Sequence, residues 1–148
     1  ILKKYNYTFQ RFAVGSKTQS KKINIEKEIG RSTLLDVTKK NFEGKPISQR
    51  IIQVRTLDHI MKGIKTKGSH GIKIDVEGYE LEVLKGAKKT LLKTNFLIVE
   101  ARHNHITFKK QYALSTLMNL MSKNNFVLTN IFTAKPFIAD LCFQPKKK

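Results

Sequence analysis

Three acidic residues stand where two predicted strands end. Asp75 and Glu77 lie at the end of the alternating run 72–77, and Glu100 ends the apolar run 96–99. Strands joined through one helix are usually neighbours, so we expect the three carboxylates to crowd one sheet edge. Crowded carboxylates raise one another's pKa, and one can then act as a base. We predict Asp75 and Glu77 as catalytic and Glu100 as substrate-binding. The alternative is that all three are solvated acids at strand ends and helix caps.

Two histidines, His103 and His105, follow Glu100 in the next predicted loop. We predict His103 as a second substrate-binding residue, and the alternative is an exposed loop histidine. A metal site built from Asp75, Glu100 and the two histidines is chemically conceivable. The spacing of these residues is not diagnostic of a metal, so we predict no metal ligand.

A strand, a turn and a helix must position the first two acids. The period of two over 72–76 predicts the strand, and Gly78 permits a sharp turn. Apolar residues at helical spacing from 81 to 91 predict one helix, with acids at its start and lysines at its end. The run 96–100 is typical of a parallel strand buried on both faces. These elements predict a right-handed βαβ unit.

The remaining elements frame this unit on both sides. After it we expect an amphipathic helix over 114–121 and an antiparallel hairpin of strands 126–132 and 137–143. Before it we expect the strands 9–14, 21–26 and 51–55, a loop over 30–46 anchored by Leu34 and Leu35, and a helix from Leu57 to about Ile64 capped by Thr56. The predicted fold class is α/β, with a partial sheet that is mostly parallel and ends in an antiparallel hairpin.

The composition narrows the class of protein. The 148 residues, 40% of them hydrophobic, suit one globular domain over 1–145, followed by a basic tail at 146–148. No run of 18 apolar residues exists, so we predict no membrane span. The lone Cys142 lies in an apolar run and suits a buried, inert thiol in a reducing compartment, so we expect a cytoplasmic protein.

The net charge of +18 raises nucleic acid or an anionic surface as a partner. Only five of the 29 basic residues are Arg, the residue that nucleic-acid sites favour for its bidentate geometry. The lysines are also spread along the chain. We therefore expect solvated lysines and no nucleic-acid partner, and a non-catalytic basic module stays as the alternative function.

The central segment reads Ile72-Lys-Ile-Asp-Val-Glu-Gly-Tyr-Glu-Leu-Glu-Val-Leu-Lys-Gly-Ala87. It closely resembles the acidic motif of the FkbM family of S-adenosylmethionine-dependent methyltransferases. Weaker resemblances occur in the family's order, and together they extend from about Phe9 to Phe132. They are found at Ala13-Val-Gly15, Ser32-Thr-Leu34, Val54-Arg-Thr-Leu-Asp58 and Ile98-Val-Glu100.

The resemblance implies a class I, Rossmann-like methyltransferase fold. It also implies methyl transfer from S-adenosylmethionine to a hydroxyl of a sugar or natural product, so the expected partner is a hydroxyl-bearing small molecule or glycan. Asp75 and Glu77 would lie beside the transferred methyl group. Asp75, assisted by Glu77 or Glu100, would orient or deprotonate the acceptor hydroxyl.

One part of the family's pattern is missing from this sequence. The family holds S-adenosylmethionine with a glycine-rich turn and an acidic residue early in its domain, whereas this chain begins with Ile1 and contains no Gly-x-Gly pair. We therefore expect the C-terminal portion of one such domain, without cofactor-binding residues, inactive alone and unable to bind the cofactor tightly. A remaining alternative is an inactive remnant that forms oligomers to cover an open sheet edge.

Overall fold

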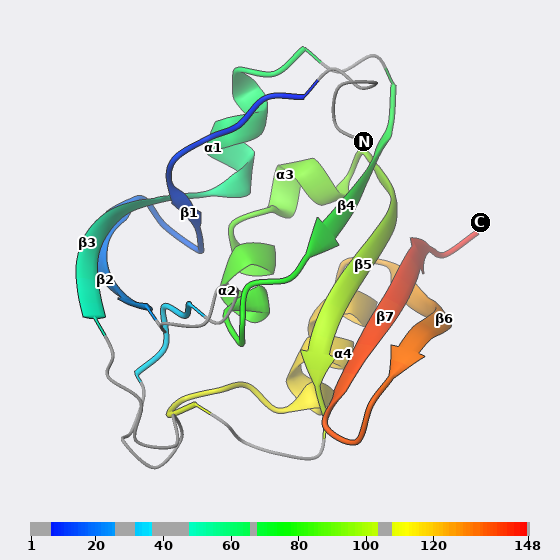
Figure 1. The fold of residues 1–148 in the computed structure, drawn as a ribbon. Helices are drawn as coiled ribbons and strands as arrows, with labels where there is room; N and C mark the ends of the chain where they lie inside the picture. The colour runs from blue at the N-terminus through cyan, green and yellow to red at the C-terminus, as the bar shows by residue number, and fades with distance from the viewer. Residues whose placement is uncertain (1–6, 26–31, 37–47, 66–67, 104–107, 148) are drawn as a thin grey trace.

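The computed structural model describes all residues except 1–6, 26–31, 37–47, 66–67, 104–107 and 148 (Figure 1). Its elements alternate between strands and short helices. In chain order they are β1 (Ala13–Val14), β2 (Gln19–Ile25), β3 (Ser48–Arg55), α1 (Leu57–Lys62), β4 (His70–Ile74), α2 (Glu80–Lys85), α3 (Lys88–Leu91), β5 (Thr94–Arg102), α4 (Leu114–Lys123), β6 (Phe126–Ala134) and β7 (Ile138–Pro145).

The strands form two sheets that lie apart in Figure 1. The first has the order β1-β3-β2, and the second has the order β4-β5-β7-β6. Only β1 with β3 and β4 with β5 pair in parallel, while the other neighbours are antiparallel. The α/β class is confirmed, but the expected mostly parallel sheet is not, because both sheets are mixed. Within the described residues β4 pairs with β5 alone, so β4 is an edge strand of the second sheet.

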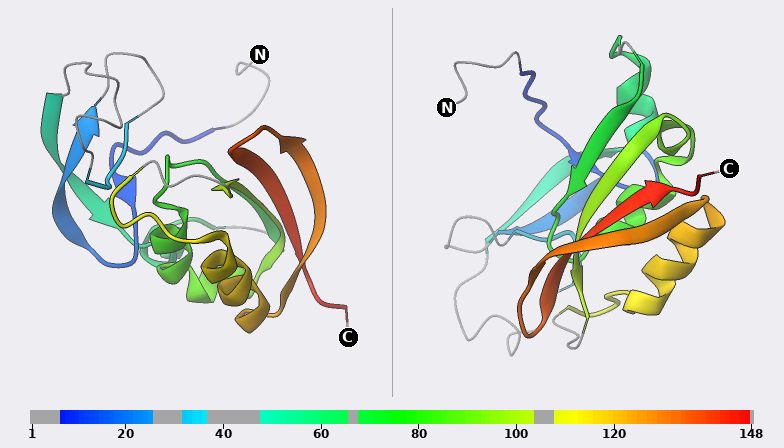
Figure 2. Two further views of the ribbon diagram at one scale, coloured as in Figure 1. Left: turned by 90° about the horizontal axis from the view of Figure 1, so that it is seen from below. Right: turned by 90° about the vertical axis from the view of Figure 1, so that its right-hand side faces the viewer.

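The main core lies on one face of the second sheet. Leu97, Val99 and Ala101 of β5 are fully buried there, and α2, α3 and α4 cover them (Figure 2). The alternate residues of β5 point to the other face and are only half-buried at Ile98 and Glu100. The expectation of a strand buried on both faces is therefore wrong, because the described helices pack on one face only. None of these helices combines the length and the apolar character needed to cross a membrane.

A smaller core joins the first sheet to the turn after β4. Leu34 and Leu35 pack there with Val54, Tyr79 and Phe108. The predicted anchoring role of the two leucines is confirmed, since their exposed fractions are 6% and 9%. The turn after β4 is thus held from the side of the first sheet as well as by its own helix.

The single helix predicted over 81–91 is broken at Gly86 into α2 and α3. In a continuous helix the Gly86 carbonyl would accept the Thr90 amide. It accepts the Asp58 amide instead, at 3.0 Å, and the Thr90 amide donates to Asp58 Oδ1 at 2.8 Å. Asp58 therefore ends α2 and caps α3, although it lies 28 positions before Gly86 in the sequence.

Gly86 also sits against the backbone that follows β1. A Cβ at this position would lie 2.1 Å from the Gly15 carbonyl oxygen. We expect Gly86→Ala to lower the free energy of unfolding by about 1–3 kcal/mol, because neither backbone can move freely. Urea denaturation measures the loss. Gly63→Ala is the matched control, since its nearest neighbour is 3.7 Å away and its φ of −85° suits alanine; equal losses in both variants would contradict this packing.

The other predicted elements are largely present. Thr56 caps α1 by accepting the His59 amide, although α1 ends at Lys62 and not near Ile64. The amphipathic helix and the final hairpin are confirmed as α4 and the β6–β7 pair. The strand expected over 9–14 is too long: only Ala13–Val14 is a strand, and Phe9 is 77% exposed and has no apolar face to cover. Most of the loop expected over 30–46 lies outside the described residues.

Candidate active site

Asp75, Glu77 and Glu100 come together as predicted at the carboxyl end of β4. Ile74, the last residue of β4, pairs with Val99 of the parallel strand β5, so Asp75 and Glu100 follow as neighbours. One carboxylate oxygen from each of the three lies within 4.8 Å of the others. We call these three residues the acid cluster. It occupies the face of β5 that carries Glu100, opposite the helices.

Two cations partly neutralise the acid cluster. Arg102 donates to Glu77 at 2.6 Å, and both side chains are less than a fifth exposed. Lys73 lies 3.1 Å from Asp75, but this pair is open to solvent and contributes little binding energy. Arg102 belongs to β5, two residues after Glu100 and on the same face. The cluster is therefore an ion-paired site and not a bare group of acids.

The surroundings of Glu100 change its pKa. Burial raises the pKa of Glu100 first, and the negative charges of Asp75 and Glu77 raise it further, to about 7. Arg102 acts in the opposite direction without cancelling the shift. A carboxyl with this pKa exchanges its proton near neutral pH, which is the property required of a general base.

The turn that carries Glu77 is held by Glu80. Glu77 and Gly78 have φ values of +51° and +93°, a backbone conformation that non-glycine residues rarely adopt. The Glu80 carboxylate accepts the Gly78 amide at 2.9 Å and the Val76 amide at 3.3 Å. Glu80 is only 2% exposed, and burial raises its pKa. The sequence indicates only an acid at the start of a helix, and in the structure Glu80 is an internal clamp on the turn.

Thr33 holds the same turn from the other side. Its hydroxyl donates to the Glu77 carbonyl at 2.8 Å and accepts the Leu35 amide at 3.2 Å. Thr33 is 1% exposed. Its role could not be found from the sequence, because the contact joins positions 44 residues apart. The turn is thus fixed by one polar side chain on each side.

A model of the Methyltransferase FkbM domain matches residues 2–128, which include the acid cluster and both side chains that hold its turn. The chain belongs to the FkbM methyltransferase family. No curated protein matches the chain, and no solved structure does. The family membership rests on the match to the domain model, and it agrees with the resemblance seen in residues 72–87.

A fourth acid, Asp140, lies beside the cluster of this FkbM-family chain. Asp140 of β7 is the cross-strand partner of Glu100, and its charge also raises the pKa of Glu100. Its Oδ1 atom is buried and has no hydrogen-bond partner in the described part of the chain. Asp140 is not among the site residues predicted from the sequence, although a single acid inside the apolar run 137–143 is a usable signal. It lies beyond the residues matched by the family model.

His103 is not part of the acid cluster. It follows Ala101 in the alternation of β5 and lines a cavity of about 380 Å³ formed with Leu114 and the β6–β7 hairpin. Its Nε2 lies 3.1 Å from the Lys135 carbonyl oxygen. The predicted substrate-binding role of His103 therefore stays a prediction, at a position separate from Glu100. His105 lies outside the described residues.

The carboxylates of the acid cluster are possible metal ligands, and a cavity lies beside one of them. Three carboxylates at this spacing could bridge a divalent cation, but Glu77 is committed to Arg102 and Asp75 lies beside Lys73. Asp75 also lines a cavity of about 290 Å³ with Val14, Leu57 and the apolar side of β4. Asp75 is the residue that this cavity shares with the acid cluster.

Proposed function

We propose that this FkbM-family protein carries the acceptor side of an S-adenosylmethionine-dependent O-methyltransferase, with Glu100 as the general base. The observation that carries the proposal is the acid cluster, in which one carboxyl has a pKa of about 7 beside two further carboxylates. A base with this pKa is half deprotonated at neutral pH and can still take a proton from a hydroxyl. The proposed acceptor is a hydroxyl of a small molecule or glycan.

The residues of this chain would act on the acceptor in three ways. Glu100 accepts a hydrogen bond from the acceptor hydroxyl and then holds its proton. Asp75 and Glu77 make Glu100 more basic, and protonating Glu100 relieves the repulsion among the three carboxylates. Arg102 keeps Glu77 in place through the 2.6 Å ion pair. Orientation of the hydroxyl contributes more to the rate than the proton transfer itself.

S-adenosylmethionine, when bound, supplies an electrophilic methyl group. The residues present fit one end of this cofactor: Asp75, which lines the adjacent cavity, complements the positive charge that the methyl-bearing sulfur carries. The cavity of about 290 Å³ is at the lower limit of ordinary ligand pockets, which start near about 300 Å³. We assign no described residue to the adenosine end of the cofactor.

Asp75→Asn tests the proposal in the complete natural polypeptide. We expect methyl transfer to fall at least about tenfold, because Glu100 loses the nearby charge that makes it basic and the acceptor loses a positioning contact. The assay follows tritium from labelled S-adenosylmethionine into a panel of monosaccharides and hydroxylated natural products. Asp36→Asn is the control, since Asp36 is exposed and joins Lys109 through its backbone. Unchanged turnover in Asp75→Asn would refute the proposal.

A further inference from the structure

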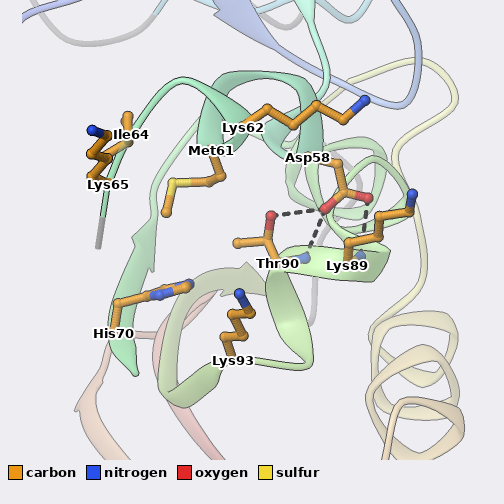
Figure 3. A pocket seen from close by; sticks show the side chains of 9 residues that line it. All are labelled: Asp58, Met61, Lys62, Ile64, Lys65, His70, Lys89, Thr90 and Lys93. Atoms are coloured by element: carbon orange, nitrogen blue, oxygen red, sulfur yellow. Dashed lines mark hydrogen bonds between the residues drawn. The ribbon is translucent and has the colours of Figure 1, made fainter. Parts of the chain in front are cut away.

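A third cavity lies at the other end of β4. It has a volume of about 440 Å³, and the residues lining it are Asp58, Met61, Lys62, Ile64, Lys65, His70, Lys89, Thr90 and Lys93 (Figure 3). His70 begins β4, whereas Asp75 follows its end, so the two sites are separated by about 16 Å along the strand. The cavity shares no residue with the acid cluster or with the pocket beside Asp75.

The contact between Thr94 and His70 assigns a proton to one nitrogen of the His70 ring. The Thr94 hydroxyl donates its one proton to the Thr90 carbonyl oxygen at 3.0 Å. The same hydroxyl lies 3.3 Å from His70 Nε2, so it must accept from an Nε2–H group. In the neutral form of the ring, Nδ1 is then the acceptor nitrogen. It is buried and has no hydrogen-bond partner within the described residues. A buried acceptor of this kind calls for a donor, and the described protein groups do not supply one there.

The lining of the cavity is strongly cationic. Four lysines contribute to it, and the one acid, Asp58, already accepts from the Lys89 amide, the Thr90 amide and the Thr90 hydroxyl. Figure 3 shows the His70 ring and the Lys93 side chain both directed toward the middle of the pocket. Lysines are favourable near the carbonyl groups at the C-terminal ends of helices, which explains their presence at the ends of α1 and α3. This effect does not account for the unpartnered acceptor between those lysines.

We propose that this cavity binds a hydroxyl-bearing phosphate ester of the size of a sugar phosphate. The phosphate meets Lys93 and the lysines at the rim, and a hydroxyl of the same molecule donates to His70 Nδ1. Lys93 is exposed, so its side chain can change rotamer on a fast timescale to meet a ligand. A dianion without a donor, such as sulfate, satisfies the lysines but leaves the nitrogen unpartnered. The proposal is independent of the methyl-transfer function, because it concerns binding at a separate site.

Calorimetry on the 148-residue chain at low salt tests it, with glucose 6-phosphate, inorganic phosphate, sulfate and glucose as probes. We expect glucose 6-phosphate to bind at least about tenfold more tightly than sulfate, the gain of one well-made hydrogen bond to a buried acceptor. His70→Phe should remove that margin, and Lys93→Gln should weaken both anions severalfold. Lys123→Gln, which removes the same charge from the exposed end of α4, should change neither.

Three results would overturn the proposal. Equal binding of sulfate and glucose 6-phosphate would mean that lysine charge alone attracts anions. Equal binding of inorganic phosphate and glucose 6-phosphate would show that the cavity does not select a phosphate ester. An unchanged affinity in Lys93→Gln would place the site elsewhere, and this variant stays informative if His70→Phe is too unstable to measure.

Discussion

Glu100→Gln is expected to lower methyl transfer by about 10²- to 10⁴-fold in the complete natural polypeptide, the usual contribution of a general base. Glutamine keeps the shape of the side chain and its hydrogen-bonding capacity but cannot take a proton. The rate is measured as tritium transferred from labelled S-adenosylmethionine at saturating acceptor. Glu82→Gln is the control, because Glu82 contacts Ser16 and Lys85 outside the acid cluster. A Glu100→Gln enzyme with normal turnover would remove Glu100 from the mechanism.

Glu100→Gln lowers the rate but should raise the free energy of unfolding, by an amount that depends on pH. The folded-state pKa of Glu100, about 7, lies above its ordinary value of 4.5, so the folded protein holds the proton more tightly than the unfolded chain. The stability that Glu100 contributes is therefore lost as the pH rises from about 4.5 to about 7. Glu100→Gln avoids this loss. Urea denaturation at about pH 5 and about pH 8 should therefore show that the stability of the variant, relative to that of the original chain, is greater at the higher pH. Parallel pH profiles would contradict the assigned pKa.

Glu80→Ala is expected to lower the free energy of unfolding by about 3 kcal/mol, because it leaves the Val76 and Gly78 amides without a buried acceptor. It should also reduce methyl transfer, although Glu80 does not belong to the acid cluster. Loss of the clamp releases a turn in which Glu77 has a positive φ, and Glu77 then leaves its place beside Glu100. Urea denaturation and the tritium assay measure the two effects.

Two further variants separate the clamp from a general effect of removing an acid. Glu80→Gln keeps an acceptor oxygen and should restore most of the stability at neutral pH, since it also avoids burying a charge. Glu82→Ala, on the half-exposed side of α2, should cost less than about 1 kcal/mol. If Glu80→Gln is as damaging as Glu80→Ala, the charge matters and not the hydrogen bonds to the turn.

The parts of the site that follow from local patterns could be predicted from the sequence. The alternation over 72–76 and the apolar run 96–99 specify two strands, and chain connectivity makes them parallel neighbours. Those two facts are enough to bring Asp75, Glu77 and Glu100 together. The family motif at 72–87 is also local, because a single strand, turn and helix contain it, so the amino-acid sequence alone is enough to recognise the family.

The remaining features depend on contacts between distant segments. Gly86 ends a helix because Asp58 takes over its hydrogen bonding, and helical spacing alone contains no trace of that partner. The prediction that groups His103 with Glu100 depends on β5 ending at Glu100. The strand continues to Arg102, and the alternation then carries His103 to the opposite face. Asp140 joins Glu100 only through the pairing of β5 with β7.

A carboxyl NMR titration of Glu100 in the 148-residue chain tests most directly whether the three carboxylates act as one coupled group. We predict an apparent midpoint near pH 7 for Glu100. Asp75→Asn should move the midpoint down, whereas Asp36→Asn should leave it unchanged. A Glu100 midpoint near 4.5 that does not respond to Asp75→Asn would show that the three carboxylates are independent solvated acids, and would contradict the proposed role of Glu100.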